Sequence, residues 1–398
     1  MKILVLNCGS SSIKYALYNM DNHKVLASGG AERVGLEGAF VKVKLANGEK
    51  EKVMHEMLNH TEGINFILSL LMDPKLGAIK SLSEIDAVGH RMVHGGEKFK
   101  QSVLITDDVI REFEAVSDLA PLHNPANLMG IRAIQNLMPH LPQVGVFDTS
   151  FHQTMPEYAY MYAIPYELYK KYGVRRYGFH GTSHRYVSAR ACEFLGLPYN
   201  QQRIITCHIG NGASLAAIKN GQCIDTSMGL TPLEGLMMGT RAGDIDGGAI
   251  TYLQKKMQLD PDQMSTFLNK QCGVSGFTQI SPDMRDIEAA AKENNHIAQL
   301  ALNMYTYRIR KYIGAYAAAM GGLDVLVLTA GVGENQCGIR ANAISGLEFL
   351  GIKIDAEKNA IRGKEVEISA ADSRVRVVII PTDEELMIAK DTLAIISK

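Results

Sequence analysis

The chain has 398 residues, 46% hydrophobic and 21% charged, which is an ordinary globular composition with enough length for two or three domains. Its formal net charge of −1 provides no overall field for a nucleic acid or an anionic membrane, so we expect neither as a partner. The six cysteines are scattered without a C-x-x-C pair, and no stretch approaches a membrane span, which indicates reduced thiols in a cytoplasmic protein.

The N-terminal stretch ILVLNCGSSSIKYALY, residues 3–18, predicts two strands joined by a tight turn. Residues 3–6 form an apolar run that is typical of a buried strand, and residues 13–18 return to the alternation of a second strand. Asn7 closes the first strand, and the turn that follows is rich in glycine and serine. Such a hairpin is common, so its importance depends on whether the pattern recurs.

Strands and helices alternate along the rest of the chain, which favours an α/β fold. In the first part we expect strands near 40–45, 85–93 and 143–148 and helices near 63–72, 107–117 and 125–138. In the second part we expect a hairpin over 203–227, a long helical region over about 283–320, and buried strands from 323 and at 375–380. The spacing Thr382-x-x-Glu385 predicts a capping box at the start of the last helix.

The opening hairpin pattern recurs about 200 residues later: apolar strand, polar residue, glycine, small-residue turn, serine and apolar strand. The matching polar residue, glycine and serine are Asn7, Gly9 and Ser12 in the first copy and His208, Gly210 and Ser214 in the second, whose spacing is one residue longer. The repetition predicts two halves of the same architecture that face one another.

Three glycine turns, at 9–12, 210–214 and 331–335, each follow an apolar strand. The chain has no Walker-type G-x-x-x-x-G-K-[ST], and the glycines of GVGENQCG have the wrong interval for a dinucleotide fingerprint. Backbone N–H groups in such turns can bind phosphate closely. Two facing hairpins and a late glycine loop together predict an ATP held in a cleft between similar domains, as in the actin–hexokinase–heat-shock ATPase superfamily.

Within that superfamily the chain resembles the acetokinase family over its whole length. The motifs that carry the resemblance are VLNCGSSSIKY (5–15), GHRMVHGG (89–96), LAPLHNPAN (119–127), FDTSFHQTMP (147–156), RRYGFHGTSH (175–184), CHIGNGAS (207–214), MGLTPLEGLMMGTRAGDIDGG (228–248) and TAGVGEN (329–335). The resemblance implies a cytoplasmic homodimer that transfers the γ-phosphoryl group reversibly and directly, in line, between ATP and acetate, giving ADP and acetyl phosphate. It also implies Mg²⁺, with Mn²⁺ as a substitute.

The resemblance implies two actin-like, ribonuclease H-like domains, each a mixed sheet flanked by helices, with the nucleotide in the cleft between them. Residues 1–150 with 384–398 would form the acetate-side domain, and residues 151–383 would form the nucleotide-binding domain.

The chemistry of a carboxylate acceptor explains which side chains such a site needs. Acetate is already ionised at pH 7, so its attacking oxygen needs no general base. Two anions must instead approach each other, which requires cations and precise placement. Arg91 and Arg241 lie in glycine-bearing loops, and their planar guanidinium groups suit carboxylate and phosphoryl oxygens.

Three histidines are further candidates. By resemblance, His180 would donate a hydrogen bond to a phosphoryl oxygen, His123 would lie near substrate, and His208 near a nucleotide phosphate. Zinc ligation by His180 and His184 is disfavoured because no H-E-x-x-H is present and a glycine interrupts the pair. His123 and His208 could also be ordinary core histidines.

Two carboxylates and one amide complete the expected polar site. Asp148 ends a strand and could orient Arg91, orient His180, or hold a water on Mg²⁺. Glu384 could simply complement the dipole of the last helix. The resemblance instead makes Glu384, with Asn7, the anchor of Mg²⁺, which binds few protein ligands and keeps several waters.

The remaining candidates follow from the same resemblance. Four apolar residues would surround the acetate methyl group: Val93, Leu122, Phe179 and Pro232. The nucleotide would be held by Ser10, Ser12, Lys14, His208, Ile209, Gly210, Asn211, Gly212, Asp283, Met284, Arg285, Gly331, Val332, Gly333, Glu334 and Asn335.

Two other functions remain open at this stage. A kinase for propionate or butyrate would differ only in pocket volume. A non-enzymatic ATP switch of the same fold would need neither the two arginines nor an apolar pocket beside the γ-phosphate.

Overall fold

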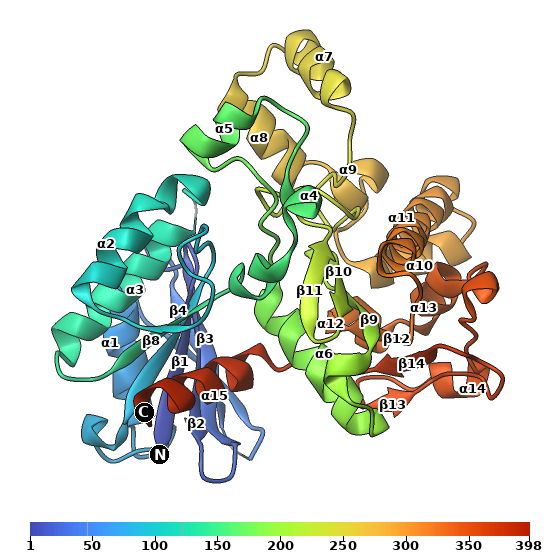
Figure 1. Cartoon of the computed structure of the whole chain (residues 1–398). Helices are drawn as coiled ribbons and strands as arrows, with labels where there is room; N and C mark the ends of the chain where they lie inside the picture. The colour runs from blue at the N-terminus through green and yellow to red at the C-terminus, as the bar shows by residue number, and fades with distance from the viewer. Residues whose placement is uncertain (46, 122) are drawn as a thin grey trace. The chain divides into compact units, whose positions relative to one another are not determined.

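A computed structural model describes residues 1–45, 47–121 and 123–398. The chain divides into two compact units: unit 1 consists of Met1–Phe151 and Asp383–Lys398, and unit 2 of His152–Thr382. The predicted boundaries, after residues 150 and 383, each lie one residue from these divisions. Both units are mixed α/β, as predicted (Figure 1).

Unit 1 contains an eight-stranded sheet in the order β5-β4-β3-β2-β1-β6-β8-β7. Its strands are β1 (Lys2–Cys8), β2 (Ser12–Asn19), β3 (Lys24–Glu32), β4 (Phe40–Leu45), β5 (Lys50–Met54), β6 (Ala87–Met92), β7 (Val103–Leu104) and β8 (Gln143–Phe147). Its helices are α1 (His60–Leu71), α2 (Asp107–Ala115), α3 (Asn124–Leu137) and α15 (Glu384–Ile396).

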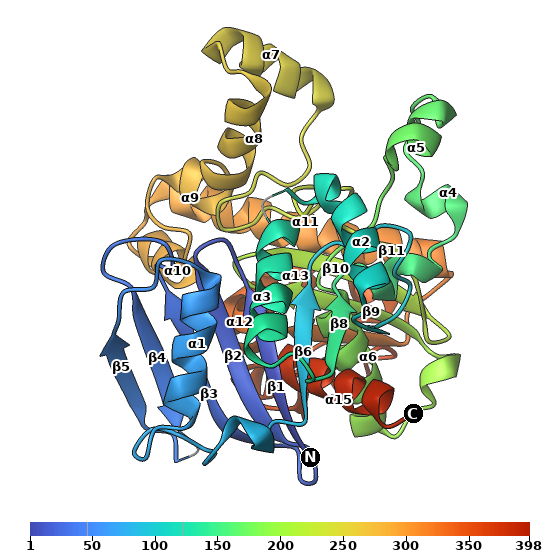
Figure 2. The same ribbon diagram turned by 90° about the vertical axis from the view of Figure 1, so that its left-hand side faces the viewer.

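Alternate residues of the first strand face two different cores. Leu4 and Leu6 pack with α1 and α3, whereas Ile3 and Val5 pack with α15. The sheet is therefore covered by helices on both faces around β1, which explains the continuous apolar run of that strand. Figure 2 shows α1 and α3 in front of the strands of this unit.

Unit 2 contains a six-stranded sheet in the order β11-β10-β9-β12-β14-β13. Its strands are β9 (Arg203–Ile209), β10 (Ala213–Lys219), β11 (Gln222–Thr226), β12 (Val325–Thr329), β13 (Val366–Glu367) and β14 (Arg376–Ile379). Its helices are α4 (Glu157–Tyr160), α5 (Tyr166–Tyr172), α6 (Gly181–Leu195), α7 (Gly247–Met257), α8 (Pro261–Lys270), α9 (Gly273–Thr278), α10 (Met284–Lys292), α11 (His296–Met320), α12 (Ala330–Asn335), α13 (Cys337–Ile344) and α14 (Ala356–Asn359). Helix α6 packs on β9 and β12, and α11 packs on β9 and β10.

The two sheets share one topology, which confirms the predicted duplication. The order β3-β2-β1-β6-β8 in unit 1 corresponds to β11-β10-β9-β12-β14 in unit 2. In unit 1, β1 is antiparallel to β2 on one side and parallel to β6 on the other. In unit 2, β9 is likewise antiparallel to β10 and parallel to β12. The carboxyl ends of the parallel strands meet at one edge of each sheet, which is where α/β proteins bind ligands.

The serines that the sequence pattern matched in the two hairpins occupy different positions. The first turn consists of residues 9–11, and the Gly9 N–H donates to the carbonyl of Ser12, the first residue of β2, over 2.8 Å. The second turn has the same length, residues 210–212, so Ser214 is the second residue of β10, opposite His208, and is fully buried. Ser12 and Ser214 are therefore not equivalent, and Ser214 cannot serve as a turn donor.

Two local predictions were wrong. The glycines at 331–335 form the short helix α12 rather than a loop. The helical region predicted over 283–320 is confirmed and consists of two helices, because α10 ends at Lys292 and Asn295 caps α11. The last helix is capped by Asp383, whose side chain accepts from the Leu386 N–H over 2.9 Å, and not by Thr382.

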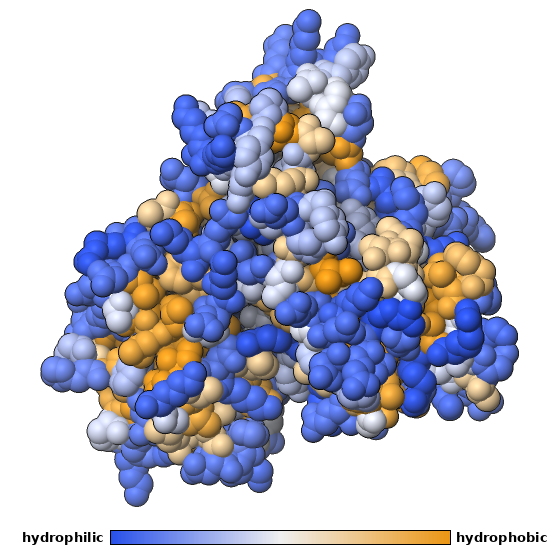
Figure 3. Space-filling model, in the orientation of Figure 1, coloured by the Kyte–Doolittle hydropathy of each residue, from blue (hydrophilic) through white to orange (hydrophobic). Residues whose placement is uncertain are grey.

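The surface and the cysteines add little that is specific. Hydrophobic residues form several separate patches among hydrophilic ones on the face shown in Figure 3. Within the described ranges, no helix combines the length and the apolar character needed to cross a membrane. All six cysteines are free thiols, as predicted.

Candidate active site

Arg91 and Asp148 form an ion pair at the edge of unit 1 where the parallel strands have their carboxyl ends. Arg91 lies on β6, and not in a loop as its glycine-bearing motif predicted, while Asp148 follows β8, which pairs with β6 in parallel. The guanidinium bonds both carboxylate oxygens, with Nε at 3.1 Å from Oδ1 and Nη2 at 2.6 Å from Oδ2. Asp148 is 1% exposed and raises the pKa of Arg91 above its ordinary value. The side chain of Arg91 keeps 27% exposure, so it can also contact a ligand.

Asn7 and Glu384 lie beside this ion pair and offer two hard oxygen ligands. Nη1 of Arg91 is 3.5 Å from Oδ1 of Asn7. Oε1 of Glu384, in the first turn of α15, is buried and has no hydrogen-bond partner among the described residues. A buried carboxylate oxygen without a partner fits a cation ligand, and one carboxylate with one amide oxygen suits Mg²⁺. No cluster of three or more His, Cys, Asp or Glu side chains placed to hold a metal occurs among the described residues.

Burial raises the pKa of Glu384 to about 7. Arg91 and Lys14 oppose this effect, while Asp148 and Glu385 add to it. A carboxyl group whose pKa is higher in the folded protein than in the unfolded chain weakens folding once it must ionise. The penalty is small below the ordinary value of 4.5 and complete above about 7.

We therefore expect Glu384→Gln to stabilise the metal-free protein at pH 8 by about 1–3 kcal/mol. The gain should shrink as the pH falls through 7 and be much smaller at pH 5, which serves as the internal control. Thermal unfolding of both proteins in EDTA at the two pH values measures it. A variant that is less stable than the parent at pH 8 would contradict this account.

The other predicted residues of unit 1 lie as follows. Lys14 is exposed on β2 opposite Asn7, and it lines a hollow of about 470 Å³ with four further lysines: Lys42, Lys44, Lys50 and Lys52. Ser10 is in the first turn, Ser12 is the first residue of β2, and His123 is the residue before α3. Val93 is buried, and its N–H donates to Oδ1 of Asn127 over 3.0 Å. Leu122 lies outside the described residues.

In unit 2, Arg241 and His180 converge on the second glycine turn. A β-carbon built on Gly212 would lie 3.4 Å from Nη1 of Arg241 and 3.5 Å from Nε2 of His180. Nη1 also donates to the Pro232 carbonyl over 3.2 Å. His180 has a φ of 56°, a left-handed conformation that is strained for a non-glycine residue and typical of functional sites. His208 stacks on His180 with ring centroids 4.1 Å apart.

The same turn borders a cavity of about 730 Å³ within unit 2. Eight predicted nucleotide residues line it: Gly210, Asn211, Asp283, Met284, Arg285, Gly331, Val332 and Asn335. A cavity of this size suits a cofactor-sized ligand. Arg285 pairs with Asp283, whose pKa falls to about 2 because the guanidinium donates to it.

Five predicted nucleotide residues of unit 2 do not line the cavity: His208, Ile209, Gly212, Gly333 and Glu334. Ile209 is buried in β9, and Gly333 is buried in α12. Glu334 has a structural task, because its Oε1 accepts from the N–H groups of Ala330 and Thr382 over 2.7 and 3.1 Å. Phe179 is buried, and its carbonyl is bonded by Nε2 of His152 over 2.8 Å.

Sequence reasoning missed two polar groups in the wall of this cavity. Oη of Tyr305, on α11, and Oε1 of Gln336 are buried and lack hydrogen-bond partners among the described residues. Both residues line the cavity. Unpartnered buried polar atoms at a cavity wall are suited to a polar ligand. Tyr305 lies in a long helix and Gln336 lies between two short helices, and nothing in the neighbouring sequence marks either residue as part of a binding site.

Residues 2–390 of the chain match the acetokinase family. The chain belongs to this family. An acetate kinase of Phocaeicola vulgatus is 64% identical over 398 residues, which is 100% of both chains. The crystal structure of the Porphyromonas gingivalis acetate kinase has a TM-score of 0.96 at 58% identity, and a propionate kinase of Francisella tularensis has 0.92 at 42%, each covering 99% of both chains.

Membership in the acetokinase family makes the protein a nucleotide-using kinase that acts on acetate. Its two α/β units have the fold of the acetate kinase and propionate kinase structures just described, as predicted.

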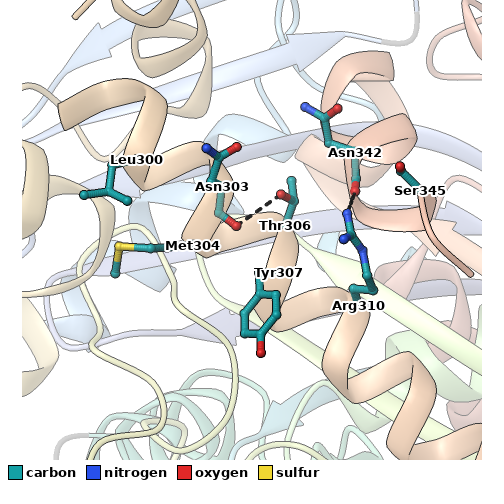
Figure 4. Close-up of a pocket in the computed structure, with 8 residues that line it drawn as sticks. All are labelled: Leu300, Asn303, Met304, Thr306, Tyr307, Arg310, Asn342 and Ser345. Carbon is teal, nitrogen blue, oxygen red and sulfur yellow. Dashed lines mark hydrogen bonds between the residues drawn. The ribbon is translucent and has the colours of Figure 1, made fainter. Parts of the chain in front are cut away.

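A further hollow on unit 2, of about 440 Å³, contains none of the predicted acetokinase residues. It lies along α11 and α13 and is lined by Leu300, Asn303, Met304, Thr306, Tyr307, Arg310, Asn342 and Ser345 (Figure 4). Arg310 donates to the Asn342 carbonyl, and the Thr306 hydroxyl bonds the Leu302 carbonyl over 2.9 Å. The side chains of Arg310 and Thr306 are therefore hydrogen-bonded to backbone carbonyls, and we assign this hollow no role in the reaction.

Proposed function

We propose that the protein transfers the γ-phosphoryl group of ATP directly, in line and reversibly to acetate, with Mg²⁺ as its metal. Acetate is ionised at neutral pH, so none of the residues has to act as a general base. The demand on the site is to bring two anions together and to stabilise the charge on the transferring group. Cationic and hydrogen-bond-donating side chains meet that demand.

The observation that carries the proposal is the arrangement around the turn 210–212. Gly210 and Asn211 border the 730 Å³ cavity, while Nη1 of Arg241 and Nε2 of His180 lie over Gly212. A nucleotide in the cavity would therefore extend its phosphates toward a cation and a hydrogen-bond donor. Backbone N–H groups of the glycine turn add to this anion site.

We assign the nucleoside to the cavity. Asp283, Met284 and Arg285 would hold one side, and the start of α12 the other. Tyr305 and Gln336 supply the polar contacts, because burial keeps the Tyr305 phenol protonated by raising its pKa, and Oε1 of Gln336 is an acceptor. The pair can therefore bind both donors and acceptors of a purine edge.

Asn7 and Glu384 would hold Mg²⁺, and Mn²⁺ would substitute for it. The bound ion supplies positive charge to the phosphate oxygens. Asp148 holds Arg91 through two hydrogen bonds, so the guanidinium presents a fixed orientation to acetate and the transferring group. His123 is proposed to lie near the acetate, and Val93, Leu122, Phe179 and Pro232 to surround its methyl group.

The substrate profile tests this function. With ATP, Mg²⁺ and hydroxylamine, we expect acetyl hydroxamate only when acetate is present, and a slower reaction with propionate. One methylene group is worth about 1–3 kcal/mol in such a pocket, so kcat/KM should fall by roughly 10- to 200-fold. ATP hydrolysis that is independent of acetate would favour a nucleotide switch, and faster turnover of propionate or butyrate would change the substrate assignment.

Two further parts of the proposal rest on the family resemblance. We expect a homodimer, which sedimentation equilibrium would measure directly. We also expect a cytoplasmic location, which cell fractionation would test.

A further inference from the structure

A chain of hydrogen bonds leads from the core of unit 2 to His180. Nδ1 of His180 is 2.8 Å from Oγ of Ser214, and the same hydroxyl is 2.8 Å from Nε2 of His184. Nδ1 of His184 is in turn 2.7 Å from Oγ1 of Thr206. Ser214, His184 and Thr206 are fully buried, so the two contacts of His184 are shielded from water, while the contact with His180 is partly buried.

The proton positions in this chain depend on one another. Burial and the neighbouring His152 and His208 hold the pKa of His184 well below its ordinary value, so that ring is neutral and has one N–H. It can donate to Ser214 or to Thr206, but not to both. The Ser214 hydroxyl has one proton as well, so it donates to one histidine and accepts from the other.

The outer end decides the direction. Nε2 of His180 lies over Gly212 with Nη1 of Arg241, and Nδ1 of the same ring is within hydrogen-bond distance of Ser214. A neutral His180 can donate to an anion there only if its single proton is on Nε2. Nδ1 must then accept from Ser214, which requires His184 to donate to Ser214 and Thr206 to donate to His184.

We propose that Ser214, with His184 and Thr206 behind it, is a positioning residue that holds His180 in the Nε2–H form aimed at the transferring phosphoryl group. This inference rests on the proposed function, because it assumes that His180 donates to that group. The backbone of His180 is strained, which is consistent with a ring that must be held in one orientation. A hydrogen-bond donor that is already in place needs no reorganisation during the reaction.

A double-mutant cycle tests the inference. We expect Ser214→Ala to lower kcat about tenfold or more, with the KM values for ATP and acetate within about threefold of the parent. In a His180→Ala background the same change should have no further effect, because Ser214 acts through that ring. Ser188→Ala is the matched control: Ser188 is also buried, but its hydroxyl bonds Tyr199 and the Arg185 carbonyl, so kcat should not change.

Each outcome of the cycle has a distinct meaning. If Ser214→Ala lowers kcat equally in both backgrounds, its effect is structural and the inference is overturned. If His180→Ala itself leaves kcat unchanged, the proposed role of His180 fails together with the inference. Thr206→Val tests the far end of the chain, because valine has nearly the shape of threonine but lacks its hydroxyl. It should also lower kcat, and it replaces Ser214→Ala as the test if that variant folds poorly.

The protonation state provides a second readout. In ¹⁵N-histidine spectra of the protein with Mg²⁺, a non-hydrolysable ATP analogue and acetate, we expect the His180 signal to show a proton on Nε2 and none on Nδ1. The signal is identified by its loss in His180→Ala. A proton on Nδ1 would overturn the proposed direction of the chain.

Discussion

Replacing Arg241 with alanine is expected to lower turnover by about a hundredfold or more, a typical loss when one preorganised charge donor is removed. The effect on stability should be small. Nη1 of Arg241 donates to the Pro232 carbonyl and contacts Sδ of Met238 at 3.9 Å, and the loss of one such hydrogen bond typically costs about 1 kcal/mol. The unfolding temperature of the variant should therefore be close to that of the parent protein, while its kcat should be much lower.

Steady-state kinetics and thermal unfolding of Arg241→Ala measure the two quantities together. Arg308→Ala is the matched control, because Arg308 is also half-buried in unit 2 and also donates to a backbone carbonyl, that of Asp244, over 3.1 Å. The control should keep its turnover. A kcat for Arg241→Ala within about threefold of the parent would remove Arg241 from the reaction.

Replacing Arg91 with alanine should lower turnover by a similar factor and also destabilise the protein. Asp148 is 1% exposed and would lose both of its guanidinium hydrogen bonds. Removing one partner of a buried ion pair typically costs about 3–5 kcal/mol, because the other charge is left without compensation. Low activity of this variant alone therefore does not separate a chemical role from a structural one.

The double variant Arg91→Gln with Asp148→Asn separates the two roles. It removes both charges but leaves neutral groups that can still bond each other, so much of the stability should return. Turnover should stay low, since the cation is still missing. Recovery of turnover together with the unfolding temperature would show that Arg91 acts only by holding the fold.

The central sheet of each unit could be predicted because its strands are buried on both faces. Residues 3–6 and 325–328 are continuous apolar runs, and all of these side chains are almost fully buried. Strand β3, with the sequence KVLASGGAE, was missed because its two adjacent glycines and its serine have low strand propensity. The backbone pairing of β3 with β2 and β4 stabilises it as a strand despite the low strand propensity of these residues.

Local chemistry left other choices open. Thr382 and Asp383 are both good caps, and the tertiary contacts decide between them. The Thr382 hydroxyl bonds Ser183 over 2.8 Å, and its N–H donates to Glu334, which leaves Asp383 to cap α15. The glycines of α12 looked like a loop for a similar reason: the contact of Glu334 with the first turn is invisible in the sequence.

In the candidate site, the sequence motifs identified the charged groups of unit 1 but not all of the polar residues that line the cavity of unit 2. Asp148, Arg91, Asn7 and Glu384 were singled out in the sequence, and in unit 1 they lie beside one another. Tyr305 and Gln336 gave no signal, because only burial and a missing partner distinguish them, and neither property can be read from residue type. The chain Thr206–His184–Ser214 was hidden for the same reason.

The central claim is that two guanidinium groups, with Mg²⁺, neutralise the repulsion between acetate and the terminal phosphate of ATP. A crystal structure of this protein with Mg²⁺, a non-hydrolysable ATP analogue and acetate tests it most directly. We predict that Arg91 and Arg241 both donate hydrogen bonds to oxygens of the terminal phosphate or of acetate. If either guanidinium pointed away from both anions, the claim would be contradicted.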